Sequence, residues 1–442
     1  MKTVRASSSP QRPSRSVEVS VSNAADSINL SDIEFWGLPW ADREAAFAVL
    51  RRERPIAFFE ELELPFLPKG PGYFAITRHA DILEISRSPE LFCSGKGATS
   101  IPDMPTEMLD FYGSMINMDD PRHQRLRGIV SRRFTPKMIQ AFMDDVEKIT
   151  IDVINRVIDK GSAEFVSEVA APMPLIVICN LMGIPESQHQ LVFDKSNIIL
   201  SGGDPDFLPP DTENPIMVFM EAGASLAALL RDLAQHRLKH PSDDLVSALV
   251  NTELDGERLT DEEIASFFIL LAVAGNETTR TAISHGMVAL EQHPDQARLW
   301  RNDFETIAPT AVEEIVRWAT PVIFMRRTVT RDTVLSGHQF HEGDKTILFY
   351  NSANRDEAVF EDPYRFDLRR APNPHVGYGG PGPHFCMGAH LARREITVMF
   401  RELFKRIPDI HITGEPAQLR SAFINGIKRL PVEFTPGGAR AA

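Results

Sequence analysis

The chain has 442 residues, of which 43% are hydrophobic and 24% charged, and its 47 basic and 61 acidic side chains give a formal net charge of −14. This composition is that of a globular protein, and the acidic balance disfavours binding to nucleic acid. Its three cysteines are scattered and form no CxxC pair, which excludes a disulfide framework and disfavours structural zinc. We therefore expect a cytoplasmic protein without a nucleic-acid partner.

The two ends of the chain differ in composition from the rest. Residues 1–30 begin with a segment rich in Ser, Arg and Pro that lacks the apolar stretch of a signal peptide, and residues 437–442 are small or polar. The longest apolar run, 267–275, is less than half of the about 20 residues that a membrane-spanning helix needs. We expect a soluble protein in which one domain, 31–436, lies between two disordered tails.

Helical periodicity dominates the chain between these ends. Apolar residues recur at helical spacing in segments 44–53, 136–160, 217–237, 261–293, 309–319 and 389–404. Shorter stretches rich in β-branched and aromatic residues predict strands at 72–77, 327–335, 346–350 and 432–435. The absence of a regular alternation of strands and helices argues against a doubly wound sheet or a barrel. The pattern predicts a mainly α fold with a minor β-sheet.

The clearest predicted element is the helix at 261–293. Thr260 and Glu263 form a capping box at its start, and the residues that follow are apolar all round, as in a buried helix. At about 1.5 Å per residue this helix would be nearly 50 Å long. Its middle, 274–279, turns polar, which is costly inside a core unless a ligand or reaction needs those groups.

Cys386 lies in a glycine-rich loop, 375–388, just before the predicted helix 389–404. Glycines let a backbone approach a planar ligand closely and leave amide N–H groups free to point at the sulfur. A cysteine at a helix N-terminus also feels a positive end charge, which lowers its pKa and favours the thiolate, the form that binds metal. The alternative is a buried free cysteine, as most lone cysteines are.

The same loop fits GxGxxG over residues 377–382. That dinucleotide-binding motif must follow a strand and open a helix. Pro372 and Pro374 precede it here, and Pro383 interrupts the start of a helix. We therefore exclude a dinucleotide site.

Two charged motifs are ambiguous when each is taken alone. His123 and Arg127 are four residues apart on a predicted helix face, where they could grip an anionic group such as a carboxylate, although a solvated basic face has the same pattern. Glu314 and Arg317 form an i,i+3 pair with Arg365 as a possible third partner, and such pairs are common on surfaces.

Together, and in chain order, four motifs resemble the cytochrome P450 family. They are Asp-Pro-x-His-x-x-x-Arg from Asp120, Ala-Gly-x-Glu-Thr from Ala274, Glu-x-x-Arg from Glu314, and a Gly-rich His-x-Cys-x-Gly loop ending at Gly388. The resemblance covers residues 31–436. It implies a mainly helical fold with a minor sheet, with haem b held between the long central helix and the cysteine loop and O2 as co-substrate.

The resemblance also assigns roles. Cys386 would be the axial thiolate ligand of the haem iron, and Glu277 and Thr278 an acid–alcohol pair that supplies protons to bound oxygen. The haem would contact Ala274, Gly275, Tyr378 and Gly388, its propionates would meet His123, Arg127, Arg327 and His384, and Glu314, Arg317 and Arg365 would lock the core beneath it. A thiolate ligand favours O–O cleavage, while a hydroxyl can hold the oxygen and a water, and a carboxyl can relay protons.

Tyr378 departs from the family pattern, because the loop aromatic lies eight residues before the cysteine instead of seven and is Tyr rather than Phe. The longer Gly-Gly-Pro-Gly loop and the stretches 111–118, 266–271 and 352–356 resemble a mycobacterial subgroup that oxidises lipid and sterol side chains. This implies ω-hydroxylation, at a terminal methyl, of a methyl-branched isoprenoid or fatty lipid. The implied pocket residues, each equally at home in an apolar core, are Ile101, Ala274, Val322, Phe324 and Phe423.

Three alternatives remain open: a sterol side-chain oxidase, a peroxide-driven peroxygenase, and a haem protein for binding or sensing. The last two would not be expected to keep the Glu277–Thr278 pair.

No flavin or nicotinamide domain is present in the sequence. We therefore expect electrons from NAD(P)H to arrive through a separate ferredoxin reductase and ferredoxin. The basic segment Arg122–Arg133, with Arg393 and Arg394, is a candidate docking surface for an acidic ferredoxin, and a solvated basic face is the alternative. A monomer is expected.

Overall fold

The structure is a computed structural model that describes residues 24–63, 67–133, 136–201, 203–210, 212–251, 253–254 and 257–437, with the backbone alone for 132–133, 136–143, 253–254 and 257. Of the predicted tails, 1–30 and 437–442, residues 1–23 and 438–442 lie outside the described residues. Residues 24–30 differ from the expectation of a tail. They begin with the 3-10 helix η1 (Ala24–Ser27) and bury Leu30 in the core.

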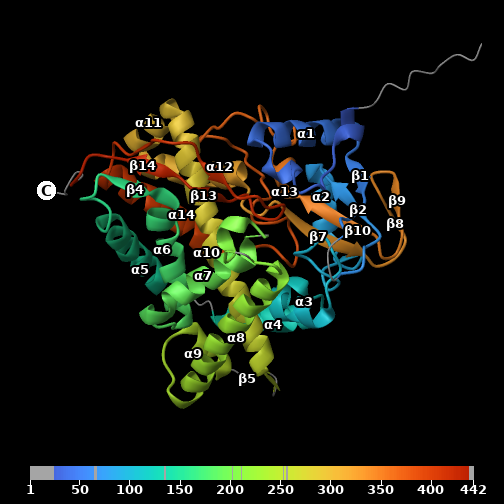
Figure 1. Cartoon of the computed structure of the whole chain (residues 1–442), viewed down its shortest axis with the longest axis horizontal. Coiled ribbons are helices and arrows are strands. Elements are labelled where there is room, and N and C mark those ends of the chain that lie inside the picture. Colours follow the sequence, from blue (N-terminus) through green and yellow to red (C-terminus); the bar gives the residue numbers. More distant parts are fainter. Residues whose placement is uncertain are drawn as a thin grey trace, which may run out of the picture.

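Helices make up most of the described chain (Figure 1). They are α1 (Trp40–Glu53), α2 (His79–Arg87), α3 (Thr106–Gly113), α4 (Arg122–Arg133), α5 (Pro136–Asn155), α6 (Pro172–Met182), α7 (His189–Leu200), α8 (Pro215–Lys239), α9 (Leu245–Val250), α10 (Asp261–Gln292), α11 (Pro294–Asn302), α12 (Phe304–Ala319), α13 (Tyr350–Ala353) and α14 (Ala389–Arg406). The strands are β1 (Ile56–Phe59), β2 (Tyr73–Ile76), β3 (Phe92–Cys93), β4 (Ser162–Glu164), β5 (Glu253–Leu254), β6 (Glu257–Arg258), β7 (Phe324–Val329), β8 (Thr333–Leu335), β9 (His338–Phe340), β10 (Lys345–Phe349), β11 (His411–Ile412), β12 (Ala417–Gln418), β13 (Ile427–Arg429) and β14 (Pro431–Glu433).

Helix α10 runs through the middle of the molecule, between the helices at the left of Figure 1 and the sheet at its right. It packs against α3, α6, α7, α8, α12 and α14. The capping box at its start is present, because Glu263 N–H donates to Thr260 Oγ1 at 3.1 Å and Thr260 N–H donates to the Glu263 carboxylate at 3.0 Å. The sequence predicted both the buried helix and its first residue.

The largest sheet has the strand order β1-β2-β10-β7-β3. Strands β2 and β10 pair in parallel, and the other neighbours pair antiparallel. Side chains of a strand alternate between the two faces, so Arg326 and Arg327 of β7 point to opposite sides. Arg326 bonds Asp103 at 2.7 Å, whereas Arg327 lines a cavity beside α10. The sheet therefore brings a cation to the side of the molecule where α10 lies.

The mainly α fold class with minor β-sheet is confirmed, and the differences lie at element boundaries. Pro309, expected at the start of a helix, lies inside α12. The run predicted as one strand at 327–335 is divided by a turn between β7 and β8. Among the described residues, no helix combines the length and the apolar character that crossing a membrane would require.

Candidate active site

A cavity of about 310 Å³ lies between the middle of α10 and the loop that carries Cys386. Segments that are far apart in the sequence meet here, from α4, α10, β7 and the glycine-rich loop. The predicted site residues that line it are Arg127, Ala274, Gly275, Thr278, Val322, Arg327, Tyr378, His384, Cys386 and Gly388. The structure thus brings together most of the residues that the sequence singled out.

The α10 wall of the cavity is a stripe at helical spacing. Leu271, Ala274, Gly275 and Thr278 are more accessible than their buried neighbours because they face the cavity. The Thr278 hydroxyl donates to the Ala274 carbonyl oxygen at 2.8 Å, which leaves its own oxygen available as an acceptor. A Cβ on Gly275 would lie 2.5 Å from Ile178 Cδ1, so glycine here allows α6 to pack closely against this wall.

The opposite wall is the glycine-rich loop, whose path holds Cys386 toward the cavity. Cys386 N–H donates to the Tyr378 carbonyl oxygen at 3.0 Å, and the Cys386 side chain is exposed to the cavity. Gly379 adopts φ +87°, and a Cβ on Gly382 would lie 2.1 Å from the carbonyl oxygen of Ser86 in α2. These two positions need glycine, so the loop sequence fixes where the sulfur points.

The surroundings of Cys386 act on its thiol in two directions. Burial within the protein raises the pKa of the thiol, whereas the N–H groups of Gly388 and Ala389 and the charges of Arg127 and Arg393 lower it. Burial prevails, so the lowered pKa expected from the helix N-terminus is wrong for the free thiol. A metal ion that binds this sulfur would displace its proton.

Four basic residues converge at one edge of the cavity. The rings of His123 and His384 lie 4.3 Å apart, and Arg127 and Arg327 line the cavity beside them. Burial, Arg327, His123 and Arg127 together hold the pKa of His384 well below its usual range. The two arginines donate to backbone carbonyls, of Phe385 at 2.6 Å and of Arg326 at 2.7 Å, and neither has a salt bridge within the described part of the chain. This edge favours an anionic group.

A buried ionic cluster lies under the cysteine loop and corrects one prediction. Arg317 donates to both carboxylate oxygens of Glu314, at 2.7 and 2.8 Å, and both side chains are fully buried. The third partner is Arg370, whose Nε lies 3.2 Å from Glu314 Oε2. The prediction that the side chain of Arg365 is this partner is wrong. That side chain is 64% exposed, and Arg365 contributes only its backbone carbonyl, which accepts a hydrogen bond from Arg317. The chain turns after residue 365, which brings Arg370 rather than Arg365 to the carboxylate.

Comparisons with known proteins identify the family. A family model described as cytochrome P450 matches residues 219–407. A methyl-branched lipid omega-hydroxylase from Mycobacterium tuberculosis is 51% identical over 412 residues, which cover 92% of this chain and 95% of that protein. The chain belongs to the cytochrome P450 family. A steroid C26-monooxygenase from Mycolicibacterium smegmatis is 39% identical over 401 residues, covering 88% of this chain and 90% of that protein. The structure of a Mycobacterium marinum cytochrome P450 in complex with pseudoionone has a TM-score of 0.87 and 41% identity, covering 92% of this chain and 99% of that one.

The protein is a P450 monooxygenase, and its family implies haem iron with O2 as the oxygen donor. The residues present fit this group. A thiol faces the cavity, and Arg127 and Arg327, which have no salt bridge among the described residues, border it and could hold the two propionates of a haem. Within the same part of the chain, buried His123 Nε2 has no hydrogen-bond partner, as expected for a donor whose acceptor belongs to a ligand.

Glu277, the other half of the predicted acid–alcohol pair, is placed differently from Thr278. Its side chain is buried and is not among those that line the cavity of this P450. Its carboxylate accepts a hydrogen bond from Arg280, one turn further along α10. Arg280 in turn donates to Asn197 Oδ1 of α7 at 2.9 Å. The acid therefore starts from an ion pair rather than from contact with solvent.

The predicted pocket residues divide into two groups. Ala274 and Val322 line the cavity, whereas Ile101, Phe324 and Phe423 are not among the lining residues. These three belong to an apolar cluster between α1 and the sheet, where the rings of Phe324 and Phe423 lie 5.3 Å apart. Each was equally compatible with a packed core, and the structure places them in one.

Sequence reasoning missed two sets of cavity residues. One is apolar: Leu181, Phe267, Leu270, Leu271 and Met325. Phe267 and Leu271 continue the spacing of Ala274 and Thr278 back along one helix face, a signal that could have identified them. The other is Glu395 of α14, a buried carboxyl whose pKa burial raises to about 8 and which bonds Thr279. The available signal for Glu395 was an acidic side chain at a position of the predicted helix 389–404 where an apolar residue would be expected.

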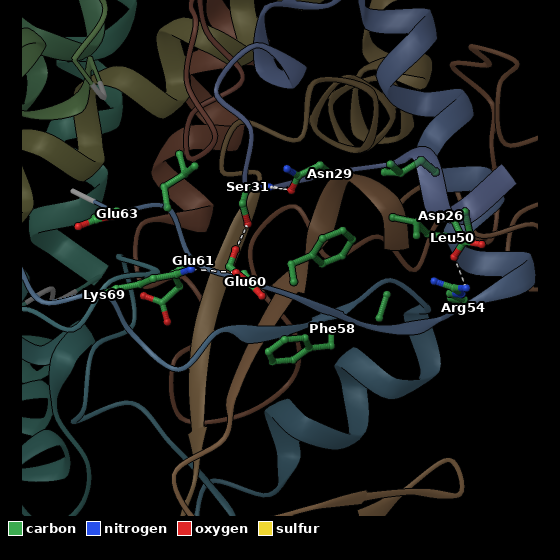
Figure 2. Close-up of a pocket in the computed structure, with 15 residues that line it drawn as sticks. Asp26, Asn29, Ser31, Leu50, Arg54, Phe58, Glu60, Glu61, Glu63 and Lys69 are labelled. Carbon is green, nitrogen blue, oxygen red and sulfur yellow. Dashed lines mark hydrogen bonds and ion pairs between the residues drawn. The ribbon is translucent and has the colours of Figure 1, made fainter. Parts of the chain in front are cut away.

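A second hollow, of about 670 Å³, lies at the opposite end of the sheet, between η1, α1 and β1 (Figure 2). Two ion pairs join charged side chains that line it. Arg54 bonds Asp26, and Lys69 Nζ lies 2.8 Å from Glu60. The hydroxyl of Ser31 donates to the Glu60 carbonyl oxygen at 2.6 Å. None of the predicted site residues lines this hollow.

Proposed function

We propose that this P450 hydroxylates the terminal methyl of a methyl-branched isoprenoid or fatty lipid, so that RH, O2, two electrons and two protons give ROH and water. The observation that carries the proposal is the α10 side of the cavity, where Leu181, Phe267, Leu270 and Leu271 offer the substrate apolar contacts beside Thr278. An apolar chain end fits such a wall, and a polar group would lose its hydrogen bonds there. The similarity to a methyl-branched lipid omega-hydroxylase supports the same substrate class.

Within this proposal, Cys386 would hold the haem iron through its sulfur, and the N–H groups of Gly388 and Ala389 would stabilise its thiolate. His123, Arg127, Arg327 and His384 would hold the propionates. When bound, the haem supplies the oxygen activation that no side chain can provide.

Thr278 acts on the other side of the cavity. Its hydroxyl proton is donated to Ala274, so its oxygen accepts one hydrogen bond from the cavity and holds a water near the bound substrate. Glu277 is the proton source behind it, once its carboxyl is free to turn from Arg280. The apolar wall fixes which carbon of the substrate lies nearest, because a terminal methyl is a harder target than the C–H bonds beside it.

Electrons come from NAD(P)H through a ferredoxin reductase and a ferredoxin that docks on α4. This helix borders the cysteine loop, since Arg127 bonds the Phe385 carbonyl and Ser131 Oγ lies 3.7 Å from the sulfur of Met387. Arg393 and Arg394 contribute less than expected, because Glu313 and Glu147 lie 2.6 and 3.7 Å from them. We propose a cytoplasmic monomer.

A sterol side-chain oxidase is the second candidate, favoured by the similarity to a steroid C26-monooxygenase. Both substrates present a branched, apolar chain end, so the same wall serves either. A peroxide-driven peroxygenase is the third, and the Glu277–Thr278 pair on α10 counts against it.

Optical titration of the purified holoenzyme tests the proposal, using a methyl-branched lipid, its straight-chain analogue and a sterol. The expected result is a low- to high-spin shift of the haem Soret band that is largest for the branched lipid, with product analysis showing a terminal hydroxyl. A shift with the sterol alone would move the substrate to the second candidate. Product formation with peroxide, but none with NADH and redox partners, would support the third.

A further inference from the structure

The backbone of the described chain is strained at two buried positions, Ser114 and Thr320. Their φ angles are +45° and +36°, in the region that residues with a β-carbon rarely adopt. Only 0% and 2% of their surfaces are exposed. The other residues of the described chain with positive φ, glycines aside, are Ser336 and Asp362, and both are exposed. Such strain costs free energy and persists only where the surrounding structure imposes it.

Each of the two buried residues caps the end of a helix. Ser114 follows α3, and Thr320 follows α12. Helices commonly end on a glycine with positive φ, because glycine adopts this conformation without a steric penalty. A serine and a β-branched threonine therefore occupy positions where stability alone favours glycine.

Both strained residues lie directly before a part of the cavity wall. Residues 115–116 follow Ser114 and line the cavity, and residues 321–322 follow Thr320 and line it as well. The residues that follow the two exposed positions are not among those that line the cavity. Backbone strain in the core of this P450 is thus found where the chain enters the wall of the site.

The turn at Ser114 is held by a neighbouring amide. The Asn117 side chain donates to the Leu109 carbonyl oxygen at 3.0 Å and accepts from the Ala98 N–H at 2.9 Å. A Cβ on Gly113 would lie 1.8 Å from Asn117 Nδ2, so this amide packs directly against the turn. The Ser114 hydroxyl itself is buried and has no hydrogen-bond partner among the described residues. What the serine adds to the turn is therefore the restriction that its β-carbon places on the backbone.

The turn at Thr320 is held by the threonine hydroxyl. This group donates to the Arg317 carbonyl oxygen at 2.8 Å and accepts from Asn354 Nδ2 at 2.8 Å. The carbonyl oxygen of Pro321 accepts a hydrogen bond from the Asn425 N–H at 3.0 Å. Bonds to three other segments thus fix the chain where it enters this part of the wall.

We propose that Ser114 and Thr320 are positioning residues for the substrate: their restricted backbone keeps residues 115–116 and 321–322 in one arrangement and so fixes which carbon is hydroxylated. The inference rests on the proposed hydroxylation and adds the residues that confine it to one position. Glycine at either turn would let the following wall segment take several arrangements, and C–H bonds beside the terminal methyl would then react as well. Strain at the two turns is part of how the site selects a carbon.

The test compares glycine variants with conservative ones in the haem-loaded enzyme. Ser114→Gly and Thr320→Gly remove the β-carbon and its restriction. Ser114→Ala and Thr320→Ser keep the β-carbon, and Thr320→Ser also keeps the hydroxyl. Ser336→Gly is the matched control, because it makes the same change at a positive φ in the exposed turn between β8 and β9.

The first readout is amide hydrogen exchange of residues 114–118 and 320–323, followed by mass spectrometry, which needs neither substrate nor turnover. Each glycine variant is expected to exchange faster in its own segment, whereas the conservative variants and Ser336→Gly keep wild-type rates. The second readout is the ratio of terminal to adjacent hydroxylated products with ferredoxin and reductase. This ratio is expected to fall severalfold in the two glycine variants alone.

Thermal stability separates selectivity from damage to the fold. Ser114→Gly relieves strain and removes a hydroxyl without a described partner, so its thermal midpoint is expected to stay at or above that of wild type while its product ratio falls. If Thr320→Gly fails to bind haem, Thr320→Asn takes its place, because asparagine tolerates positive φ better than threonine and keeps a polar side chain.

The inference is overturned if either glycine variant, or Thr320→Asn in its place, matches wild type in the product ratio. It is also overturned if Ser114→Ala lowers the ratio as much as Ser114→Gly, since the side chain rather than the backbone would then be responsible. Products of wild type are analysed first. If wild type hydroxylates only the sterol, the proposed lipid substrate is wrong, and the same ratio measured on the sterol side chain decides the inference. If it hydroxylates neither, the proposed function and the inference both fall.

Discussion

The two hollows of this P450 are lined by different kinds of polar group. In the hollow beside η1, charged groups face one another as ion pairs, and most of them are exposed to solvent. In the cavity beside α10, Cys386, Arg127 and Arg327 face inward, and neither arginine has a salt bridge within the part of the chain that the structure describes. The hollow beside η1 is therefore a surface on which two ion pairs already form. The cavity beside α10 is a site whose side chains need a ligand, because unpaired polar groups at a buried surface are costly unless a ligand completes them.

The largest expected effect comes from the buried cluster that supports the cysteine loop. Arg370→Met should lower the free energy of unfolding by about 3 kcal/mol, because it leaves part of the Glu314 charge uncompensated in the core. The matched control is Arg365→Met, which removes an exposed side chain and should change it by no more than about 0.5 kcal/mol. Chemical denaturation followed by circular dichroism measures both. Equal losses in the two variants would restore Arg365 to the role that the sequence suggested.

Removing the hydroxyl that faces the cavity should affect chemistry rather than stability. Thr278→Ala is expected to lower ferredoxin-driven product formation roughly a hundredfold, because the group that positions the proton-carrying water is lost. Peroxide-driven product formation should change far less, since peroxide already carries its protons. Parallel product analysis with the two oxidants measures the difference. Unchanged NADH-coupled turnover in this variant would contradict the role of Thr278.

Glu395 is expected to make a moderate, pH-dependent contribution to the stability of the folded protein. The pKa of this buried carboxyl is about 8 in the folded protein against 4.5 for an ordinary Glu, so the folded state binds the extra proton between these values. Stability should therefore fall as pH rises from 5 to 8 and then level off. Thermal midpoints of wild type and Glu395→Gln across this range test the sign, because the variant lacks this dependence. If wild type instead gains stability relative to the variant as pH rises, the predicted sign is wrong.

The smallest effect is expected in the hollow of Figure 2. Lys69→Met breaks the pair with Glu60, whose two side chains are 48% and 77% exposed. Solvent-exposed ion pairs contribute little to stability, so stability, haem content and lipid-induced Soret shifts should all stay near wild type. A loss of lipid response in this variant would show that the hollow takes part in binding and would remove the contrast between the two regions.

Local patterns predicted what depends on local structure. The capping box, the polar interruption of α10 and the glycine-rich loop each lie within one short segment. Thr278 from the second and Cys386 from the third line one cavity. The spacing of Glu277 and Arg280 was also a local signal of an ion pair, although sequence reasoning did not use it.

The errors concern residues whose neighbours depend on the path of the chain. Whether Arg365 or Arg370 reaches Glu314 is decided by a turn between them, which no periodicity encodes. Phe324 and Phe423 are apolar whether they face a substrate or a core, so composition cannot separate the two. At Cys386, burial raises the pKa of the thiol by more than the N-terminus of the following helix lowers it. Burial could not be predicted, because it depends on every segment packed around the loop.

The central claim is that Cys386, rather than another of the three cysteines, is the ligand of the haem iron. The most direct test is the absorption spectrum of the ferrous–CO complex in Cys386→His and Cys179→Ser, the second being a buried cysteine of α6. We predict that Cys179→Ser keeps the long-wavelength Soret band of a thiolate ligand. Cys386→His should bind haem but lose that band, as in haem proteins with a histidine ligand. A thiolate spectrum in Cys386→His, or its loss in Cys179→Ser with haem retained, would contradict the account.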